Sequence, residues 1–225
     1  MNEIVGTLPR QFYWKGLHVP FIAPWSRERS PASTIIRVGQ GIGYAGEVSA
    51  ADRRHGNLWI RQAAVRGAGD PDLAGVHPLR QRQAMSHMLC QVCGKSTFDS
   101  DFVRWGERHL FLVRAVEGRP IGEGERTTTP PVCRPCAIES VGVCPHLRKG
   151  YTAALVKCAQ PWGIAGIVYD PRTLKPILPD TKDRLTEASF NSRLIRWTLA
   201  ARDVTTLHGC TTIDLEQLAA QGVTA

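Results

Sequence analysis

Two Cys-x-x-Cys pairs carry the clearest chemistry in this chain: Cys90 with Cys93, and Cys133 with Cys136, separated by 39 residues. A two-residue spacer lets both sulfurs of a pair face one metal ion, and two such pairs complete a tetrahedral shell around Zn²⁺. Gly94 follows the first pair, where a tight turn is expected. Since four thiolates leave no open position for water, we predict one zinc ion with a structural role and no part in catalysis.

Further candidate ligands lie close to these pairs. Cys144 and His146 follow the second pair, and His87 precedes the first. They either bind a second metal, replace a member of the main set, or bind no metal. Because the four-cysteine set is already complete, we expect Cys144 to pack as a small apolar residue and His146 to lie at the surface. The pairs are also possible redox centres, but neither has the context of a strand followed by a helix that a thioredoxin-like site needs.

The segment from residue 87 to residue 150 resembles a treble-clef zinc finger. Its first cysteine pair predicts a knuckle, and apolar runs at residues 102–105 and 109–116 predict a hairpin. A helix is expected to begin just after the second pair, at residues 137–141. The resemblance covers only the central third of the chain, and it implies a structural motif that serves many unrelated functions.

The first pair and its glycine, from Cys90 to Gly94, are also similar to the opening of His-Asn-His nucleases. The catalytic histidine of those enzymes is usually paired with a second His or an Asp. Here His109 stands alone, and no Asn and His follow it at suitable spacing. We therefore do not expect nuclease activity.

The patterns along the chain predict an α+β protein whose regions pack as one globular unit. Residues 1–86 are expected to be β-rich and basic, residues 87–150 to form the zinc module, and residues 151–225 to form a hairpin and a helix. Two short apolar runs rich in β-branched residues and a third strand candidate locate the N-terminal strands, and a short helix is expected to lead into the first cysteine pair. The expected strands are residues 17–21, 34–38 and 57–62, and the expected helix is residues 79–88.

The last third begins with a hairpin signal. Residues 164–169 and 174–178 flank a turn that contains Pro171. A helix is predicted at residues 187–202, followed by a short one at residues 215–220. Four apolar residues recur at helical spacing in the longer helix, and we expect them to face the core. They are Phe190, Leu194, Trp197 and Ala201.

The charge is basic, with a formal net value of +8 and 22 Arg against 6 Lys. Residues 1–86 hold 11 Lys and Arg against 6 Asp and Glu, a net of +5. Arginine suits bidentate contacts to phosphate and stacking on bases, although a GC-rich genome also favours arginine. We predict that a basic surface near Trp59 binds DNA or RNA. Its six arginines are Arg53, Arg54, Arg61, Arg66, Arg80 and Arg82.

The compartment follows from the cysteines and the apolar pattern. Seven cysteines, an odd number, make a poor disulfide framework, and the N-terminus lacks the basic and apolar regions of a secretory signal. The longest apolar run, residues 163–169, is too short to span a bilayer. We therefore expect a cytoplasmic protein with no membrane partner. The Gly-x-Gly-x-x-Gly sequence at residues 41–46 is expected to be a turn between strands, because no ribose-binding acid follows.

These observations favour a zinc-stabilised intracellular protein that binds nucleic acid or has a regulatory role. Two alternatives stay open. One is an enzyme that uses zinc only for structure and acts on a small anionic substrate. The other is a protein-interaction adaptor. Binding that weakens steeply with salt favours the first function, a deep pocket with convergent polar groups the second, and a large exposed apolar patch the third.

Overall fold

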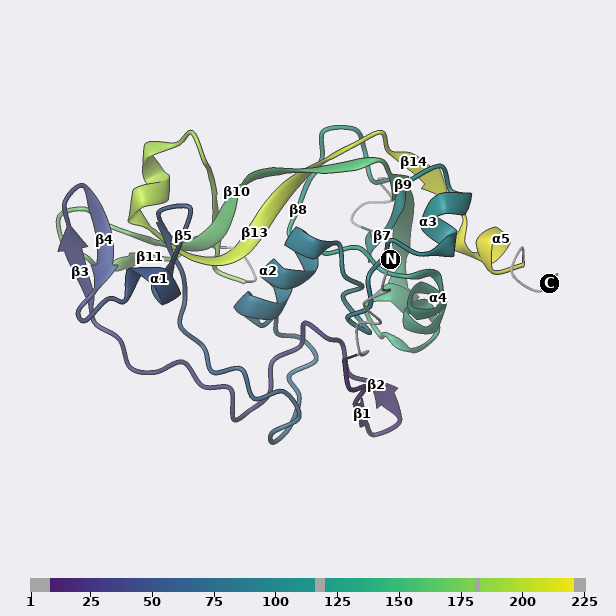
Figure 1. Ribbon diagram of the computed structural model, residues 1–225, viewed down its shortest axis with the longest axis horizontal. Coiled ribbons are helices and arrows are strands. Elements are labelled where there is room, and N and C mark those ends of the chain that lie inside the picture. The colour runs from purple at the N-terminus through teal and green to yellow at the C-terminus, as the bar shows by residue number, and fades with distance from the viewer. Residues whose placement is uncertain (1–8, 116–119, 181–182, 221–225) are drawn as a thin grey trace, which may run out of the picture.

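The computed structural model describes residues 9–115, 120–180 and 183–220. Its two longest strands, β10 (Cys158–Tyr169) and β13 (Thr198–His208), run antiparallel across the molecule at the centre of a five-stranded sheet (Figure 1). Strand β13 contains Val204 and three threonines, and β-branched residues of this kind pack well on a pleated surface. Two short strands pair with β10 and one pairs with β13. They are β11 (Pro176–Ile177), β12 (Thr186–Ser189) and β8 (Arg126–Thr127).

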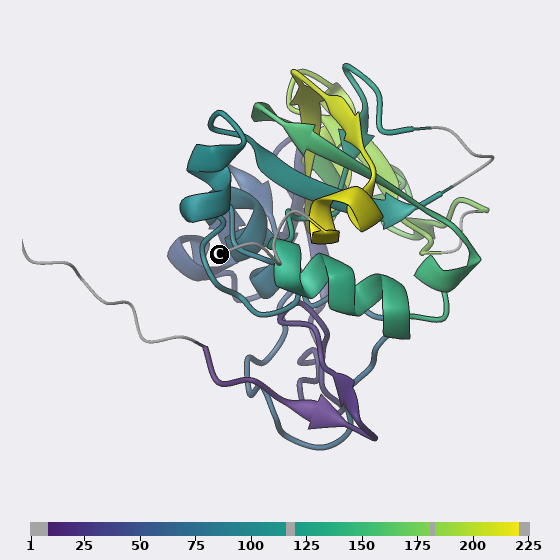
Figure 2. The same cartoon turned by 90° about the vertical axis from the view of Figure 1, so that its right-hand side faces the viewer.

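A second sheet of three strands follows the order β14-β9-β7. Its strands are β7 (His109–Arg114), β9 (Tyr151–Val156) and β14 (Thr211–Ile213). Helix α4 (Arg134–Val143) lies along this sheet beside the short α5 (Leu215–Ala220), as Figure 2 shows in green and yellow. The two helices and the sheet share one apolar core. Its fully buried members include Leu110, Ala137 and Leu215.

The N-terminal part consists of three small hairpins and short helices joined by irregular segments. The hairpins are β1 (Tyr13–Trp14) with β2 (Leu17–His18), β3 (Ile35–Val38) with β4 (Gly41–Tyr44), and β5 (Arg53–Arg54) with β6 (Asn57–Leu58). The other helices of the described chain are α1 (Ser49–Asp52), α2 (Pro78–His87) and α3 (Ser100–Arg104), with single 3₁₀ turns η1 (Leu147–Lys149) and η2 (Arg193–Trp197).

Helix α2 is held against β13 by one buried side chain. The amide nitrogen of Gln81 donates to the carbonyl oxygens of Thr128 (2.8 Å) and Asp203 (3.0 Å), and its amide oxygen accepts from the Asp203 N–H (3.0 Å). Gln81 is fully buried, so these bonds satisfy all but one of its polar capacities. They fix the position of α2 between the N-terminal hairpins and the large sheet.

The predicted α+β class is confirmed. Helix α2 matches the prediction at residues 79–88, α4 contains the predicted residues 137–141, and α5 matches residues 215–220. The hairpin predicted at residues 164–178 is also confirmed, because β11 pairs with the end of β10. Within the described residues, no helix combines the length and apolar character needed to cross a membrane.

The helix predicted at residues 187–202 is wrong. Those residues form the end of β12, the turn η2 and the start of β13. Phe190 and Leu194 are 40% and 37% exposed, whereas Ala201 is buried and Trp197 packs against a core cluster, so the predicted core stripe is wrong for two of its four residues. Pairing of β13 with β10 along ten residue pairs satisfies the backbone better than a local helix would, so tertiary pairing overrides the periodicity.

The hairpin predicted at residues 102–105 and 109–116 is also wrong. The Asp99 side chain accepts from the N–H groups of Asp101 and Phe102, and this cap starts α3. Strand β7 is present, but it pairs with β9 instead of folding back on the preceding residues. Residue 116 lies outside the described residues. The glycine-rich residues 41–44, expected in a turn, form β4.

Candidate metal centre

The four cysteines of the two pairs converge on one point. Their sulfur atoms all lie within 4.8 Å of one another, and Cys93 Sγ lies 3.8 Å from Cys133 Sγ. Four sulfurs at about 2.3 Å from a central zinc ion are about 3.8 Å apart in a regular tetrahedron. A disulfide needs a sulfur–sulfur distance of about 2.05 Å, and all four cysteines are free. The spacing therefore fits a shared metal and excludes a pair of disulfides.

The first pair lies on a tight knuckle. The N–H of Cys90 donates to the carbonyl oxygen of Lys95 (2.7 Å), and the N–H of Gly94 donates to the carbonyl oxygen of Cys90 (2.8 Å). Gly94 has a φ of +73°, and a Cβ atom there would lie 2.8 Å from the ring of Phe21. Only glycine meets both demands at low cost. The backbone bonds therefore turn both sulfurs of this pair toward one side.

The second pair lies at the start of α4. Cys133 is the N-cap residue of this helix, and Cys136 lies in its first turn. Free N–H groups and the helix dipole favour negative charge here, which suits thiolate ligands. The residue before this pair, Val132, donates its N–H to the carbonyl oxygen of Leu110 in β7 (2.8 Å). This bond to the three-stranded sheet thus fixes the position of the second pair relative to β7.

The close approach of the four thiols moves their pKa values in opposite directions. Hydrogen bonds from Cys133, Cys136 and Cys90 hold the pKa of the Cys93 thiol far below its ordinary value. The pKa of Cys136 is raised far above its ordinary value, because its neighbour Cys133, then Cys90 and Cys93, compete for the negative charge. A divalent cation at the centre would displace the retained protons and neutralise the four thiolates together.

The cluster is largely buried. Cys90, Cys93 and Cys136 are buried at 0%, 5% and 6% exposure, and Val92 and Val132 pack around them in the same apolar core, whereas Cys133 is half-buried. A catalytic metal needs a free coordination position. Four sulfurs complete a tetrahedral shell, so an ion held by all four would have no such position.

Comparisons of this chain with protein-family models, with curated proteins and with solved structures found no match. The possible chemistry of the chain therefore follows from its own residues and their geometry alone. Two groups of side chains besides the four cysteines bear on it: polar residues next to the cluster, and the six arginines of the predicted basic surface.

His18 and Glu139 lie beside the cluster, with ligand atoms within 4.8 Å of that of Cys136. Both ring nitrogens of His18 already have partners: Nδ1 lies 3.1 Å from Glu139 Oε2 and Nε2 lies 2.9 Å from Gln11 Oε1. His18 therefore connects the β1–β2 hairpin to α4. Neither nitrogen is left over for a metal in this geometry.

Cys144 and His146 lie apart from the cluster. No group of three metal-ligating side chains among the described residues includes either of them. Cys144 follows the last turn of α4 and is half-buried, whereas His146 is exposed. His146 therefore lies at the surface, as expected, whereas Cys144 is half-buried and lines a cavity.

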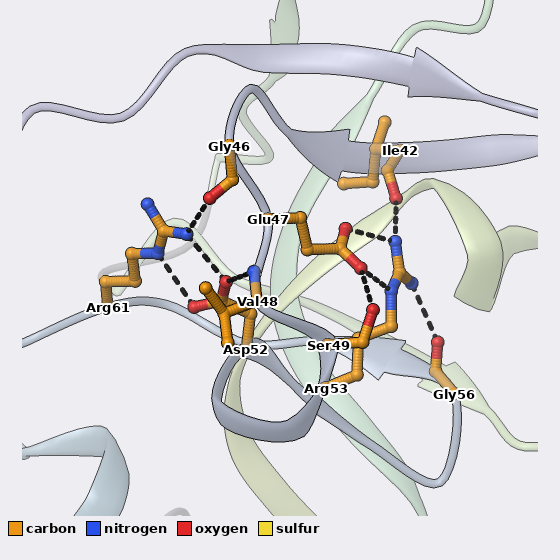
Figure 3. A network of polar contacts seen from close by, with 9 residues as sticks. All are labelled: Ile42, Gly46, Glu47, Val48, Ser49, Asp52, Arg53, Gly56 and Arg61. Atoms are coloured by element: carbon orange, nitrogen blue, oxygen red, sulfur yellow. Dashed lines mark hydrogen bonds and ion pairs between the residues drawn. The ribbon is translucent and has the colours of Figure 1, made fainter.

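Three of the six arginines hold carboxylates inside the fold. Arg53 Nε lies 2.6 Å from Glu47 Oε1, and Arg61 Nη2 lies 2.6 Å from Asp52 Oδ2 (Figure 3). The hydrogen bonds from Arg61 lower the pKa of Asp52, and those from Arg53 lower the pKa of Glu47. Arg80 forms a buried pair with its own carboxylate. These guanidinium groups are largely satisfied by protein oxygens.

The other three arginines differ from one another. Arg66 lies 5.0 Å from the ring centroid of Phe12, and burial lowers its pKa to about 10. Arg82 lies 4.6 Å from the ring centroid of Trp59. Arg54 donates to the Ser86 hydroxyl (2.9 Å) and lies 3.9 Å from Asp203. The six arginines thus do not form one continuous surface of free cations.

Asp203, Ser86 and Phe190 were not among the predicted site residues, but they gather with Arg54 around one cavity. These residues come from α2, β13 and the turn after β12, which are far apart in the chain. An isolated Asp within a run of threonines and apolar residues was the one available signal. A carboxylate inside a strand that is otherwise buried needs a partner or a ligand.

Proposed function

We propose that Cys90, Cys93, Cys133 and Cys136 bind one Zn²⁺ ion and that this ion has a structural role. The observation that carries the proposal is the convergence of four sulfurs, three of them on buried cysteines, with Cys93 Sγ and Cys133 Sγ at the spacing of a tetrahedral zinc shell. A four-sulfur tetrahedron also accepts iron, so the identity of the metal is part of the proposal. Zinc is preferred because closed thiolate shells of this kind are its usual structural sites.

The ion would join three parts of the chain. The knuckle that carries Cys90 receives backbone hydrogen bonds from Phe21 (to Val92, 2.7 Å) and donates one from Gln91 to Pro131 (2.9 Å). The second pair is linked to β7 by the hydrogen bond from the Val132 N–H to the carbonyl oxygen of Leu110. Metal binding in small zinc modules contributes an apparent ~10–16 kcal/mol, which becomes folding free energy. Loss of the ion should therefore loosen the N-terminal segment, α4 and the three-stranded sheet together.

A thermal unfolding experiment with matched serine variants tests this role. Cys133→Ser removes one proposed ligand, whereas Cys158→Ser changes an exposed cysteine of β10 outside the cluster. We expect the first variant to melt at least ~10 °C below the parent protein and the second to melt within about 2 °C of it. A Cys133→Ser protein with unchanged melting temperature and unchanged metal content would contradict the structural role.

A second proposed function is the binding of nucleic acid or of another phosphate-bearing ligand. The net charge of +8 supports it, and so does the position of Arg54. This side chain is 37% exposed, and its nearest carboxylate, that of Asp203, is too distant for a hydrogen bond. Arg53, Arg61 and Arg80 each form an ion pair with a carboxylate at 2.6 Å. Of the predicted basic surface, we therefore propose Arg54 and its neighbour Arg82 as the phosphate-binding residues.

Salt-dependent binding tests the second function. The protein is titrated at low salt with single- and double-stranded DNA and RNA, and the titration is repeated at rising salt. Arg54→Ala should weaken binding to all sequences and reduce the salt slope by about one phosphate contact. Arg172→Ala, which removes an exposed arginine from the turn after β10, should change neither. Absence of binding at tens of micromolar protein would remove nucleic acid as a partner.

A further inference from the structure

A large cavity lies between the β5–β6 hairpin, the end of α2, η2 and the paired strands β10 and β13. Its volume is about 860 Å³. Pockets that bind small molecules usually measure about 300–1,000 Å³, and they combine apolar walls with a few convergent polar groups. The walls of this cavity come from five elements that the fold holds in fixed positions, so the cavity is part of the architecture and not the gap beside one loop.

One wall carries charged and polar groups. The Asp203 side chain is 18% exposed, and no described residue donates a hydrogen bond to its carboxylate within the usual distance; Arg54, the nearest cation, lies 3.9 Å away. Burial raises the pKa of Asp203, against the opposing field of Arg54, Arg82 and His55. Arg54 is held in place by its bond to Ser86. The Asp203 carboxylate is therefore a hydrogen-bond acceptor without a donor. The guanidinium of Arg54 beside it has N–H groups left to bind a ligand.

A second unsatisfied group lines the same cavity. Thr205 is 5% exposed, and its buried hydroxyl has no hydrogen-bond partner. It faces Pro161 across the β10–β13 ladder, where the register shifts between Pro161 and Gly163. Proline has no N–H to donate, and bulges of this kind are common beside functional sites. The irregularity opens the ladder at the position where the cavity meets the sheet.

Another part of the cavity wall is apolar. Phe190 is 40% exposed at the cavity, and Ile195, Met85 and Met88 also line it. An exposed aromatic ring offers a stacking surface for a planar group, and methionine side chains adapt to the shape of a bound ligand. This wall suits a flat and mostly apolar ligand body.

The charges of the cavity favour an anion. Arg54, Arg196 and His55 line it, and Asp203 is its one carboxylate among the described lining residues. His55 and Gly56 have φ values of 50° and 79°, and this tight hairpin turn places both residues at the rim of the cavity. Guanidinium groups bind phosphate by two parallel hydrogen bonds.

We propose that this cavity binds one nucleotide unit, with its base against Phe190 and the methionines and its phosphate at Arg54 and Arg196. Asp203 would accept an N–H of the base, as carboxylates do with exocyclic amino groups. The inference rests on the proposed phosphate-binding function and deepens it by naming one cavity and one ligand class. The unit is either a free mononucleotide or the end of a strand, since both present the same chemistry. Nucleotide binding in this cavity does not require the proposed zinc ion.

Binding of 5′-mononucleotides, measured by calorimetry or fluorescence on the full chain, tests the proposal. The four ribonucleoside monophosphates are compared with inorganic phosphate, and short oligonucleotides with a 5′-phosphate are compared with the same strands bearing a 5′-hydroxyl. Arg54→Met and Phe190→Ala should each weaken binding of the preferred nucleotide about tenfold or more, because each removes a charged contact or a stacking contact. Arg172→Met should leave binding unchanged.

The outcomes distinguish the nucleotide cavity from nucleic-acid binding elsewhere on the protein. Mononucleotide binding that both cavity variants weaken supports a free-nucleotide site, and binding only of 5′-phosphorylated strands supports a strand-end site. Nucleic-acid binding that neither variant changes, without mononucleotide binding, overturns the cavity proposal and leaves nucleic-acid binding intact. Absence of all binding overturns both. Phe190 is exposed, so its variant should fold even if Arg54→Met does not, and an unchanged metal content and melting temperature verify this.

Discussion

The guanidinium of Arg80 binds the carboxylate of Glu28 through two hydrogen bonds of 2.6 Å each, although 52 positions separate the two residues in the chain. Both side chains are buried, at 5% and 0% exposure. Arg80 also donates to the carbonyl oxygen of Ala23 (2.8 Å), and Glu28 accepts from the N–H of Trp25 (2.8 Å). The pair therefore attaches the irregular N-terminal segment to helix α2.

Breaking this pair should destabilise the fold strongly. Glu28→Gln leaves the Arg80 cation buried without its counter-charge, and we expect a loss of about 3–5 kcal/mol in the free energy of unfolding. Denaturant titration measures it. Asp183→Asn is the control, because it removes the more exposed partner of Arg202 at 3.0 Å and should cost less than about 1 kcal/mol. Equal losses of unfolding free energy in the two variants would show that burial does not make the Arg80–Glu28 pair more important for stability than an exposed pair.

Stability should fall in mild acid because of His77. This residue is fully buried, and burial lowers the pKa of its ring below the ordinary 6.5. The folded chain keeps the ring neutral while the unfolded chain binds a proton, so stability declines as the pH falls below about 6.5. Burial tends to raise the pKa of Glu28, but the bonds from Arg80 and Trp25 outweigh it and the net pKa is lowered, so a further loss follows below about 4.5.

A variant separates the His77 contribution from acid release of a metal. His77→Gln retains a donor toward the carbonyl oxygen of Ala63, which His77 Nε2 meets at 3.0 Å, but it does not titrate. Denaturant titrations of both proteins between pH 8 and pH 5.5, with metal content checked at each pH, should give a flatter pH dependence for the variant. Identical slopes would mean that His77 does not contribute.

Gly41 is required by the close approach of η2. A Cβ atom at this position would lie 2.5 Å from the carbonyl oxygen of Arg196, which is backbone and cannot move freely. Gly41→Ala should therefore lower the free energy of unfolding by about 1–3 kcal/mol. Gly122→Ala is the control, since nothing lies within 4 Å of a Cβ there, and it should be neutral or slightly stabilising. A neutral Gly41→Ala would show that β4 and η2 separate easily.

The parts of this molecule that could be predicted are those with local signals. The cluster of four cysteines follows from the spacing of its two pairs, the turn at Pro171 follows from its turn residues, and the helix at residues 79–88 is expected between a loop and the first cysteine pair. The turn and the helix depend on neighbours only a few residues away. The cluster joins two distant pairs, but each pair has its own local signal in the two-residue spacing.

The parts that could not be predicted depend on distant partners. Residues 198–202 belong to a stretch with helical apolar spacing, and they become a strand because they pair with β10. The arginines are equally ambiguous in sequence. Arg80 and Arg54 are of one type and lie in one basic region, yet one is buried against Glu28 and the other borders a cavity. Periodicity and composition do not encode which carboxylate each arginine meets.

The metal content of the purified chain tests the central claim most directly. Protein prepared without chelator is analysed for zinc and iron by mass spectrometry, together with a Cys93→Ser, Cys133→Ser double variant and the Cys144→Ser control. We predict about one zinc per chain in the parent and in the control, and almost none in the double variant, as a single four-thiolate site requires. A folded parent protein that contains no metal, or a double variant that retains its zinc, would contradict the account.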